Sequence, residues 1–345
     1  MVDNLFIVES PLQALIAVEL SLKFEDERSG VIYRLSGANR KRNDEQIEAV
    51  IEYGNWSFSK GIILEKRNAF FYHLLIRKVL KKIRIRFRGQ VKQLFLGDFH
   101  SQWMHLSRTA VNPDITILID DGAATLNVRN RFTQQGIFFP ENLWKTRNFL
   151  KELTKNIIYF DFINKEKLSK PLFFASSFLK SESIYLVDFS ALKERFKKKE
   201  NEDKANSVLF FGAKYSEAKI VSFEYELIFI SKVKDFYGGR NLSVTYCAHR
   251  DESDEKLNFI ESQLGLVVVK PCIPAELYML SENQSVAEIA SAYSSVLNNM
   301  KVLFPEKTIR SFMFMNDEIN AINKDAVLSI YEHYRSEGIL IQDFN

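Results

Sequence analysis

The sequence has few of the residues that mark several classes of protein. Only two of its 345 residues are cysteines, Cys247 and Cys272, which excludes a disulfide framework and favours a reducing compartment such as the cytoplasm. Glycine (13) and proline (7) are scarce, so we expect regular elements joined by short loops. No apolar run reaches the roughly 18–20 residues that span a bilayer, and the N-terminal segment has the pattern of a strand rather than of a signal peptide.

A large excess of one charge is also missing. The chain has 47 basic and 44 acidic residues and a formal net charge of +3, whereas nucleic-acid-binding proteins usually carry a strong basic excess. We therefore expect no nucleic acid among its partners. Hydrophobic residues make up 46% of the chain and charged residues 26%, which is typical of a globular protein, and the length fits two domains.

Short apolar runs alternate with helical patterns, which predicts an α/β fold with parallel sheets. The expected strands are Leu5–Val8, Val31–Leu35, Gly61–Leu64, Gln93–Leu96, Ile115–Ile119, Ser207–Phe211, Leu242–Cys247, Gly265–Val269 and Lys301–Phe304. The expected helices are Leu12–Leu22, Asp44–Tyr53, Ala69–Ile83, Ser101–Ala110, Glu141–Leu153 and a long one that ends near Phe236. Before the first helix, Ser10 is expected as the N-cap and Pro11 as the first helical residue.

The charge run Lys193–Lys204 separates two series of strands and helices and is expected to be a linker or a helix end. We therefore expect a first domain over residues 1–190 and a second over residues 206–320. A C-terminal helix within residues 321–345 could pack back on the first domain. Ligands of such folds bind at the carboxyl ends of the strands.

The tripeptide Asp120-Asp121-Gly122 directly follows an apolar strand, so its carboxylates emerge at the carboxyl edge of the sheet. Adjacent carboxylates suit a general base or a metal site, and their mutual repulsion raises the pKa of one of them. The alternative is a turn that ends the strand and is capped by an aspartate. Gly97-Asp98 ends another strand and is expected to line the same side.

Three groups in the second half have residue types that suit phosphate or ribose. His249 and Arg250 follow a strand and could bind phosphate, Glu276 opens a short helix, and Ser294-Ser295 precede an apolar segment as a possible cradle of N–H and hydroxyl groups. Helix capping and compensation of the helix dipole explain the same patterns equally well.

The loop that starts at Gly212 and contains Lys214 resembles a weak anion-binding loop. It is not a Walker motif, and the chain also lacks the dinucleotide-binding glycine pattern and the nucleophile elbow of hydrolases. Zinc-binding patterns such as His-Glu-x-x-His or paired Cys-x-x-Cys are absent, so we expect no metal.

The segment Arg77–Arg88 is rich in basic residues, contains no acid, and is interleaved with bulky apolar residues. Such a helix could lie on an anionic membrane surface, which would make the protein peripheral at the inner membrane. A solvated helix face is the alternative.

In this order, these motifs resemble those of bacterial sialyltransferases and polysialyltransferases of capsule and lipooligosaccharide synthesis. Asp120-Asp121-Gly122 matches the family's acidic-acidic-glycine motif, and His249 matches its His-Pro motif, with Arg250 in place of proline. Glu276 matches a nucleotide-binding glutamate, and Ser294-Ser295 match a paired serine motif. The turn at Ser10-Pro11-Leu12-Gln13 and the Gly212 loop are similar to those that open the family's two domains.

The resemblance implies two Rossmann-like domains facing across a cleft, the GT-B type of glycosyltransferase. It implies inverting transfer from a CMP-activated nonulosonic acid, with no metal and no cofactor besides this donor. Asp120 would be the base and Asp121 would position it, while Gly122 would let the backbone turn. His249 would act on the leaving phosphate, which Ser294 and Ser295 would hold.

The resemblance further implies that Glu276 binds the ribose or the cytosine edge. The carboxylate of the donor would meet Arg250, Lys214 or the turn around Ser10 and Gln13. Two alternatives stay open: a GT-B enzyme that uses CMP-Kdo or a UDP or GDP sugar, and a non-catalytic scaffold at the membrane surface.

Overall fold

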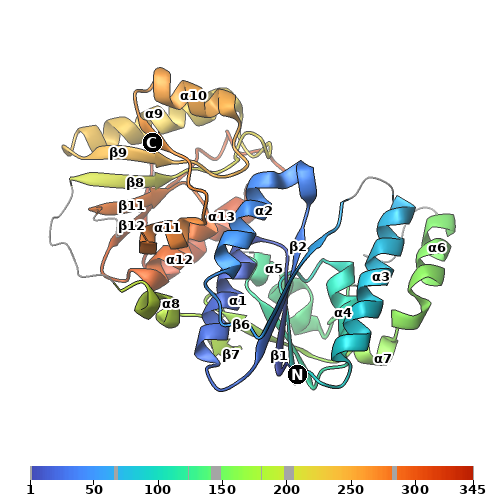
Figure 1. Ribbon diagram of the computed structural model, residues 1–345. Coiled ribbons are helices and arrows are strands. Elements are labelled where there is room, and N and C mark those ends of the chain that lie inside the picture. The colour runs from blue at the N-terminus through green and yellow to red at the C-terminus, as the bar shows by residue number, and fades with distance from the viewer. Residues whose placement is uncertain are drawn as a thin grey trace. The chain divides into compact units, whose positions relative to one another are not determined.

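The computed structural model describes residues 2–65, 69–122, 124–140, 149–179, 181–197, 206–281 and 286–344. The chain divides into two compact units, Met1–Leu192 (unit 1) and Lys193–Asn345 (unit 2). Each unit is built on one sheet in which all paired strands are parallel, with helices beside it (Figure 1). Within the described residues, no helix is both long enough and apolar enough to cross a membrane.

Unit 1 contains a seven-stranded sheet in the order β3-β2-β1-β4-β5-β6-β7. Its strands are β1 Asn4–Val8, β2 Ser29–Leu35, β3 Phe58–Ile63, β4 Gln93–Leu96, β5 Ile115–Ile119, β6 Leu172–Ser176 and β7 Ser183–Leu186. Its helices are α1 Pro11–Lys23, α2 Lys41–Ile51, α3 Ala69–Phe87, α4 Gln102–Val111, α5 Ala124–Arg131, α6 Phe149–Tyr159 and α7 Lys165–Leu168, and α8 Ser190–Arg195 spans the unit boundary. Figure 1 shows α1 and α2 on one side of the sheet and α3 and α4 on the other. All of β1 is buried, as expected for a central parallel strand covered on both faces.

Unit 2 contains a six-stranded sheet in the order β10-β9-β8-β11-β12-β13. Its strands are β8 Ser207–Phe211, β9 Ser243–Cys247, β10 Val267–Val269, β11 Glu288–Ser291, β12 Thr308–Phe312 and β13 Leu340–Gln342. Its helices are α9 Phe223–Gly238, α10 Asp254–Ser262, α11 Ala275–Ser281, α12 Ser295–Leu303 and α13 Lys324–Ser336.

Both sheets reverse their strand order at one point, which lies between β1 and β4 in unit 1 and between β8 and β11 in unit 2. In open parallel sheets the connections leave such a point toward opposite sides, so a crevice forms outside the carboxyl ends of the strands. This rule places the candidate residues of each unit at the carboxyl edge of its sheet, and the contacts below show which of them meet there.

Several expected elements have the predicted bounds, among them β4, β5 and β8. The expected strand Lys301–Phe304 is wrong, because residues 301–303 form the last turn of α12, with Leu303 buried at helical spacing. The expected C-terminal helix is α13, and it is followed by β13, which pairs with β12 and extends the sheet of unit 2. Of the expected helix Glu141–Leu153, residues 141–148 lie outside the described part, as do residues 198–205 of the charge run.

Candidate active site

The turn after β1 has the predicted geometry. Ser10 is the N-cap of α1 with an extended backbone, and its hydroxyl oxygen accepts a hydrogen bond from the Gln13 N–H over 3.3 Å. Pro11 is the first helical residue, where its missing N–H costs nothing and its fixed φ suits the helix. This cap directs the side chain of Gln13 across the carboxyl edge of the sheet.

Gln13 connects the ends of three strands in unit 1. Its side-chain oxygen accepts a hydrogen bond from the N–H of Glu9 (2.9 Å), and its side-chain nitrogen donates one to Oδ1 of Asp121 (2.9 Å). The side chain is 2% exposed and passes over Gly97 at the end of β4, where a Cβ atom would lie 2.1 Å from Gln13 Oε1. Glycine at position 97 is therefore required for this arrangement.

The two adjacent aspartates have different surroundings. Asp120 is 1% exposed, and its Oδ2 accepts hydrogen bonds from the N–H (2.7 Å) and the hydroxyl (3.1 Å) of Ser177. Burial raises the pKa of Asp120 to about 6, against the opposing hydrogen bonds of Ser176 and Ser177. Asp120 therefore fixes the loop that follows β6, and a substrate could not reach it without movement of that loop.

Asp121, in contrast, is exposed at the same edge. Its N–H donates to the hydroxyl of Thr125 over 3.0 Å, which ties the turn to α5. Gly122 has φ +65°, a left-handed conformation that glycine adopts without strain, as the predicted backbone turn requires. The carboxylate that a substrate can reach in this motif is that of Asp121.

A cavity of about 430 Å³ lies beside these strand ends and is called here the unit 1 pocket. It is lined by Glu9, Arg34, Tyr72, His73, Ile76, Asp98, His100, Ser101, Gln102 and Trp103. Glu9 Oε2 accepts hydrogen bonds from Arg34 Nη1 and Trp103 Nε1, both at 3.1 Å, so its orientation in the pocket is fixed.

Asp98 is the most perturbed carboxyl group of this pocket. Burial, together with the neighbouring charges of Glu9 and Asp121, raises its pKa to about 7. The N–H of His100, which donates to Asp98 Oδ1 over 2.7 Å, acts in the opposite direction. A carboxyl group that titrates near neutral pH in a cavity is a candidate for proton transfer.

In unit 2, the loop after β8 is anchored by a lysine that the sequence analysis did not single out. Lys256 has no exposed side-chain surface, and its Nζ contacts carboxylate oxygens of Glu226 (2.8 Å), Glu252 (2.8 Å) and Glu217 (3.0 Å). It also donates to the carbonyl of Ala213 over 3.0 Å. Buried lysines need such partners, and here the partners fix the loop from Gly212 to Glu217 against α10.

The predicted loop residues Gly212 and Lys214 lie beside this network. A Cβ atom at position 212 would lie 2.3 Å from the hydroxyl oxygen of Tyr246 and 2.7 Å from Glu252 Oε2, so only glycine fits there. Lys214 is half exposed and forms an ion pair with Asp251 over 3.2 Å. Lys214 is thus next to the strand end that carries His249.

His249 has a defined tautomer in its neutral form. Its Nδ1 accepts a hydrogen bond from the N–H of Asp251 (3.1 Å), so the ring proton is on Nε2. Burial, together with the charges of Arg250 and Lys214, lowers the pKa of His249 to about 4, and the charge of Asp251 acts in the opposite direction. At neutral pH the residue therefore presents a neutral N–H donor.

Glu276 lies in the first turn of α11 and is 6% exposed. Its Oε1 accepts a hydrogen bond from the side-chain amide of Asn299 in α12 over 2.7 Å. Burial raises the pKa of Glu276, while the Asn299 hydrogen bond and the charge of Arg250 lower it. Arg250 is thus close to both His249 and Glu276, and these three predicted residues come together.

Ser294 and Ser295 follow β11, the strand on the other side of β8. Ser294 is the N-cap of α12, and Ser295 is its first residue. The hydroxyl of Tyr334 in α13 accepts from the Ser294 N–H (2.9 Å) and donates to the Ser294 carbonyl (2.5 Å), which holds this turn from both sides. Sequence reasoning missed Tyr334 because it lies 40 residues further along the chain.

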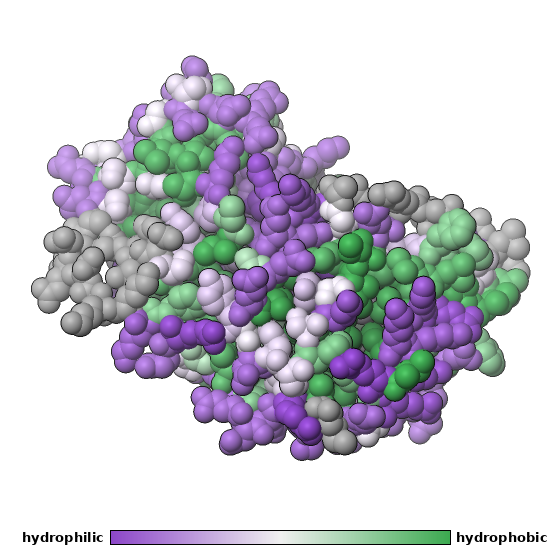
Figure 2. Space-filling view, in the orientation of Figure 1, coloured by the Kyte–Doolittle hydropathy of each residue, from purple (hydrophilic) through white to green (hydrophobic). Residues whose placement is uncertain are grey.

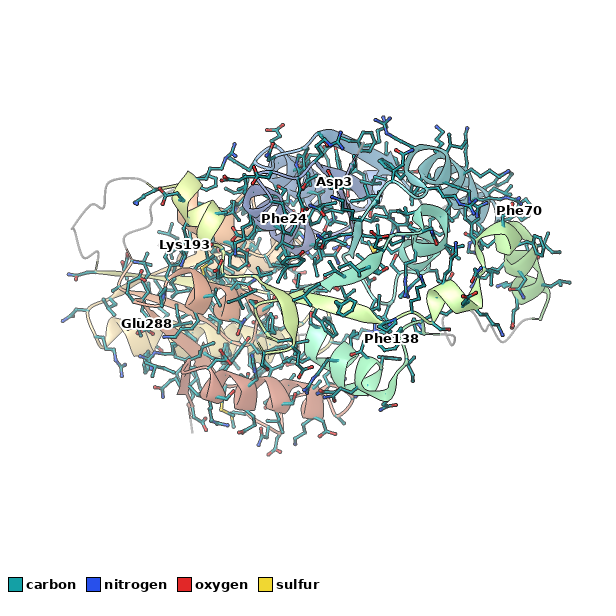
Figure 3. All side chains as sticks on the ribbon, turned by 90° about the horizontal axis from the view of Figure 1, so that it is seen from below. Asp3, Phe24, Phe70, Phe138, Lys193 and Glu288 are labelled. Carbon is teal, nitrogen blue, oxygen red and sulfur yellow. The ribbon has the colours of Figure 1, made fainter. Side chains whose placement is uncertain are left out.

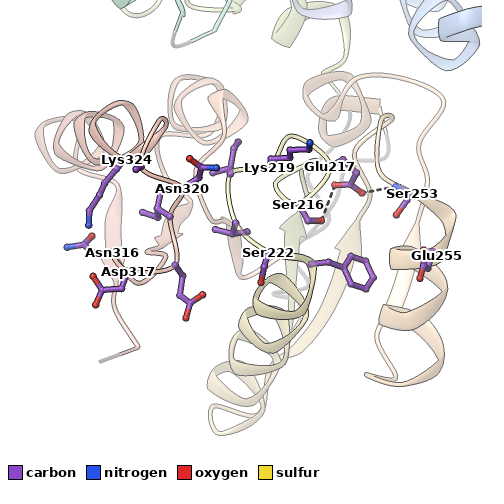
Figure 4. Close-up of a pocket in the computed structure, with 16 residues that line it drawn as sticks. Ser216, Glu217, Lys219, Ser222, Ser253, Glu255, Asn316, Asp317, Asn320 and Lys324 are labelled. Atoms are coloured by element: carbon purple, nitrogen blue, oxygen red, sulfur yellow. Dashed lines mark hydrogen bonds between the residues drawn. The ribbon is translucent and has the colours of Figure 1, made fainter.

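Unit 2 also has a cavity of about 890 Å³, which is separate from His249 and the serine pair. It lies between the loop after β8 and the segment 316–324, and Figure 4 shows Glu217 at its rim with hydrogen bonds to Ser216 and Ser253. Its charged lining, with Lys219 and Lys324 beside Glu255, Asp317 and Glu318, has no excess of positive charge for an anionic ligand. Within the described ranges, no cluster of three or more His, Cys, Asp or Glu side chains could hold a metal ion.

The fold is similar to those of solved two-domain enzymes. A Listeria monocytogenes protein described as a UDP-N-acetylglucosamine 2-epimerase has a TM-score of 0.53 at 9% identity, over 98% of this chain and 90% of that one. The Methanocaldococcus jannaschii UDP-GlcNAc 2-epimerase has a TM-score of 0.52 at 10% identity (99% and 89% covered), and S. aureus MnaA with UDP has 0.52 at 10% (97% and 88%). These likenesses concern the fold, and they confirm the prediction of two Rossmann-like domains of the GT-B type.

The sequence itself was compared with known families and proteins. No curated protein matches it significantly. Residues 4–313, which include every motif discussed above, match the family Alpha-2,8-polysialyltransferase (POLYST). The chain therefore belongs to the alpha-2,8-polysialyltransferase family and is a glycosyltransferase of the sialyltransferase type.

Proposed function

We propose that this glycosyltransferase moves a nonulosonic acid from a CMP-activated donor to a glycan hydroxyl, with inversion at the anomeric carbon and without a metal ion. The acceptor oxygen attacks the anomeric carbon while the bond from that carbon to the CMP phosphate oxygen breaks. The acceptor proton passes to a carboxylate of unit 1, and residues of unit 2 bind the departing CMP. The family name makes a glycan that already ends in sialic acid the proposed acceptor.

Asp121 is the proposed general base. It is the exposed member of the aspartate pair, and Gln13 holds its Oδ1 so that one carboxylate oxygen has a defined direction. The roles expected from the sequence are thereby exchanged: Asp120, buried beneath the Ser177 loop, positions the turn, and Asp121 takes the proton. A well-placed base contributes about 10²–10⁴-fold to the rate.

The unit 1 pocket is the proposed acceptor subsite, because it lies beside Asp121 and has fixed polar groups on its wall. Glu9, oriented by Arg34 and Trp103, would accept hydrogen bonds from acceptor hydroxyl groups. Asp98, with its pKa near neutrality, would relay or share the proton taken by Asp121.

His249 is the proposed donor to the leaving phosphate. In its neutral form the proton is on Nε2, and a phosphate oxygen that receives this hydrogen bond becomes a better leaving group. The negative charge of a bound phosphate would raise the pKa of the ring, which makes full proton transfer easier in the complex than in the free protein.

The proposed partners of the CMP phosphate and of the donor carboxylate are Arg250, Lys214 and the turn at Ser294-Ser295. The N-terminus of α12 adds backbone N–H groups and the positive end of the helix dipole. Glu276, fixed by Asn299, is the proposed ligand of the ribose or the cytosine edge. These donors and Arg250 compensate the phosphate charge, so the scheme needs no cofactor besides the donor.

The proposed biological setting is the assembly of a bacterial surface polysaccharide on the cytoplasmic side of the inner membrane. The proposed transfer reaction rests on one observation, the hydrogen bond from Gln13 to Asp121 at the carboxyl edge of the first sheet. This bond orients the exposed carboxylate of Asp121 beside the unit 1 pocket.

The direct test is incubation with CMP-N-acetylneuraminic acid, and separately with CMP-Kdo, with and without a sialylated oligosaccharide. We expect acceptor-dependent release of CMP and a product of inverted anomeric configuration by NMR. A retained configuration would refute the mechanism, and acceptor-dependent turnover of a UDP or GDP sugar but not of CMP sugars would favour the alternative donor class. A separate measurement is the thermal stability of the protein with CMP, UDP or GDP. A melting temperature that none of these three nucleotides raises would favour a non-catalytic scaffold.

A further inference from the structure

The outward faces of α3 and α6 expose an unusual number of large apolar side chains. Phe71 is 68% exposed, Ile157 is 63% exposed and Phe160, just after α6, is 78% exposed. Eight of the 19 exposed large hydrophobic residues found in the described ranges lie in α3, in α6 or directly after α6, namely Phe70, Phe71, Leu74, Leu75, Ile85, Leu153, Ile157 and Phe160. Exposed apolar groups scattered singly need no explanation, but a concentration of this kind marks a contact surface.

The two helices pack side by side, so their exposed residues form one surface. His73 Nδ1 and the hydroxyl of Tyr159 are 2.8 Å apart, and Arg77 forms an ion pair with Asp161 over 2.8 Å. Leu153, Ile157 and Phe160 follow each other at the spacing of one helix face. Figure 2 shows hydrophobic atoms gathered over α3 and α6, and Figure 3 shows Phe70 at the outer margin of unit 1.

The same surface is strongly basic at the C-terminal end of α3. The segment 77–88 contains no acidic residue. Its exposed basic side chains, which belong to α3 and to the residue after it, are Lys78, Lys81, Lys82, Arg86 and Arg88. Burial lowers the pKa of Lys167 in α7, and the charges of Arg88, Lys170 and Arg84 lower it further, which reports a positive field at this end. Two acids act at this end, Asp161, which is paired with Arg77, and Glu166, whose charge opposes the lowering of the Lys167 pKa.

We propose that α3 and α6 together form a lipid-binding face, the α3–α6 face, that docks on an anionic bilayer. Phe71, Ile157 and Phe160 enter the boundary between headgroups and acyl chains, and the lysines of α3 contact lipid phosphates. Apolar side chains next to a group of like charges fit this occupant in particular. A second copy of the chain fits the basic end of this surface poorly, because a two-fold contact centred there would place the two basic groups against each other.

The opposite face of α3 gives the docking a consequence for the acceptor, which rests on the proposed function. Tyr72, His73 and Ile76 line the unit 1 pocket, while Phe71 and Leu75 point outward from the same turns. One helix thus separates the pocket from the lipid, which suits an acceptor glycan that grows on a membrane-anchored carrier.

The test is co-sedimentation of the full chain with vesicles of phosphatidylcholine, alone or with about one third phosphatidylglycerol. We expect binding to the anionic vesicles only, weakened as salt rises from about 0.1 M to about 1 M, because the Debye length falls from about 10 Å to about 3 Å. The triple variant Phe71→Ser, Ile157→Ser, Phe160→Ser should lose roughly tenfold or more of its affinity, as should Lys78→Glu with Lys82→Glu.

A matched control is Ile184→Ser with Ile228→Ser and Ile322→Ser, which removes exposed apolar side chains elsewhere in the chain. We expect this control to bind vesicles like the unmodified chain. Equal losses in the control and the α3–α6 variants, or binding to neither kind of vesicle, would overturn the proposal. So would a dimer in light scattering that the triple variant converts to a monomer. Transfer to a soluble acceptor should be unchanged in the triple variant, so failure of the lipid-binding face and failure of the proposed chemistry remain distinguishable.

Discussion

Gln13 donates a hydrogen bond to Asp121 over 2.9 Å and thereby joins two strand ends that are not neighbours in the sheet. Strand β4 lies between them, and the Gln13 side chain passes over Gly97, the residue that follows β4. The oriented carboxylate of the candidate base thus depends on a side-chain amide from the first turn of α1 and on the absence of a side chain at position 97. Each of these dependences can be tested by a single substitution.

Gly97→Ala should reduce transfer without unfolding the protein. The added Cβ would lie 2.1 Å from Gln13 Oε1, so the amide must move and Asp121 loses its fixed partner. Misplacement of a catalytic group by about 1 Å can cost about 100-fold in rate, and we expect a fall in kcat of roughly 10- to 100-fold. Gly238→Ala, where a Cβ would meet no atom within 4 Å, is the control and should retain the original kcat. Equal rates in both variants would show that the Gln13 bridge has no role.

Asp121→Asn and Asp120→Asn should separate catalysis from stability. The first change removes the proposed base from an exposed position, so kcat should fall by about 10²–10⁴-fold with little change in Tm. The second replaces one buried acceptor oxygen by an amide NH2 group among the donors of Ser176, Ser177 and Thr125, and an unsatisfied buried donor costs about 1–3 kcal/mol of the free energy of unfolding. Steady-state kinetics and thermal unfolding of both variants measure the two effects. A large loss of kcat in Asp120→Asn at unchanged Tm would return the base to Asp120.

The sequence was sufficient for features that depend on local chemistry. The Ser10 cap, the Pro11 start of α1 and the turn at Gly122 need only neighbouring residues, and all three have the predicted form. Strand β11 was missed because its first residue is a glutamate: Glu288 is buried and paired with Arg310, and the pairing is visible only when β12 lies beside β11. The apolar run near Lys301 belongs to α12, since a short apolar run fits a buried helix as well as a strand.

The contacts that hold the candidate site together could not be predicted from a single sequence. Lys256 contacts Glu217 and Glu226, which lie 39 and 30 residues away, and Arg34 reaches Glu9 across 25 residues. A lysine in a helical pattern is normally a solvated residue, and no local signal shows that three carboxylates converge on this one. The difference between Asp120 and Asp121 is likewise a matter of burial by the loop after β6.

Lys256→Met should destabilise unit 2. Removal of the cation leaves Glu226 and Glu252 buried without their counter-charge, and breaking a buried ion pair costs about 3–5 kcal/mol. Lys214→Met is the matched control, since its ion pair is half exposed and such pairs contribute about 0–1 kcal/mol. Denaturant unfolding gives the two free energies. If Lys256→Met and Lys214→Met were equally stable, the buried network would not anchor the loop.

Asp98→Asn should change how stability depends on pH. The pKa of Asp98 is near 7 in the folded protein and near 4 in the unfolded chain, so between these values the folded state holds a proton that the unfolded state releases. Wild-type stability therefore falls as pH rises from about 4 to about 7, and the asparagine variant should not show this part of the loss. Thermal unfolding from pH 4 to pH 8 measures the difference. Parallel curves for the two proteins would mean that Asp98 titrates as an ordinary exposed carboxyl group.

The titration of His249 should change the stability of the protein with pH in the direction opposite to that of Asp98. Its pKa is about 4 in the folded protein against about 6.5 in the unfolded chain, so below pH 6.5 the unfolded state takes up a proton that the folded state does not. This contribution destabilises the fold as pH falls from about 6.5 to about 4. Glutamine at position 249 does not titrate, so the His249→Gln variant lacks this loss of stability. Its stability relative to wild type should therefore increase as pH falls from about 6.5 to about 4 and should not depend on pH above 7.

The catalytic role of His249 is tested by the same variant beside His249→Ala. Alanine removes the donor to the leaving phosphate, so kcat should fall by about 10²–10⁴-fold. Glutamine keeps an N–H donor at a similar distance but cannot release a proton, so it should recover part of the lost rate if hydrogen bonding to the phosphate matters. The measurement is kcat with the donor at saturation, which separates the chemical step from weakened binding. If both variants raised only the KM for the donor and left kcat unchanged, His249 would bind the nucleotide and take no part in departure of CMP.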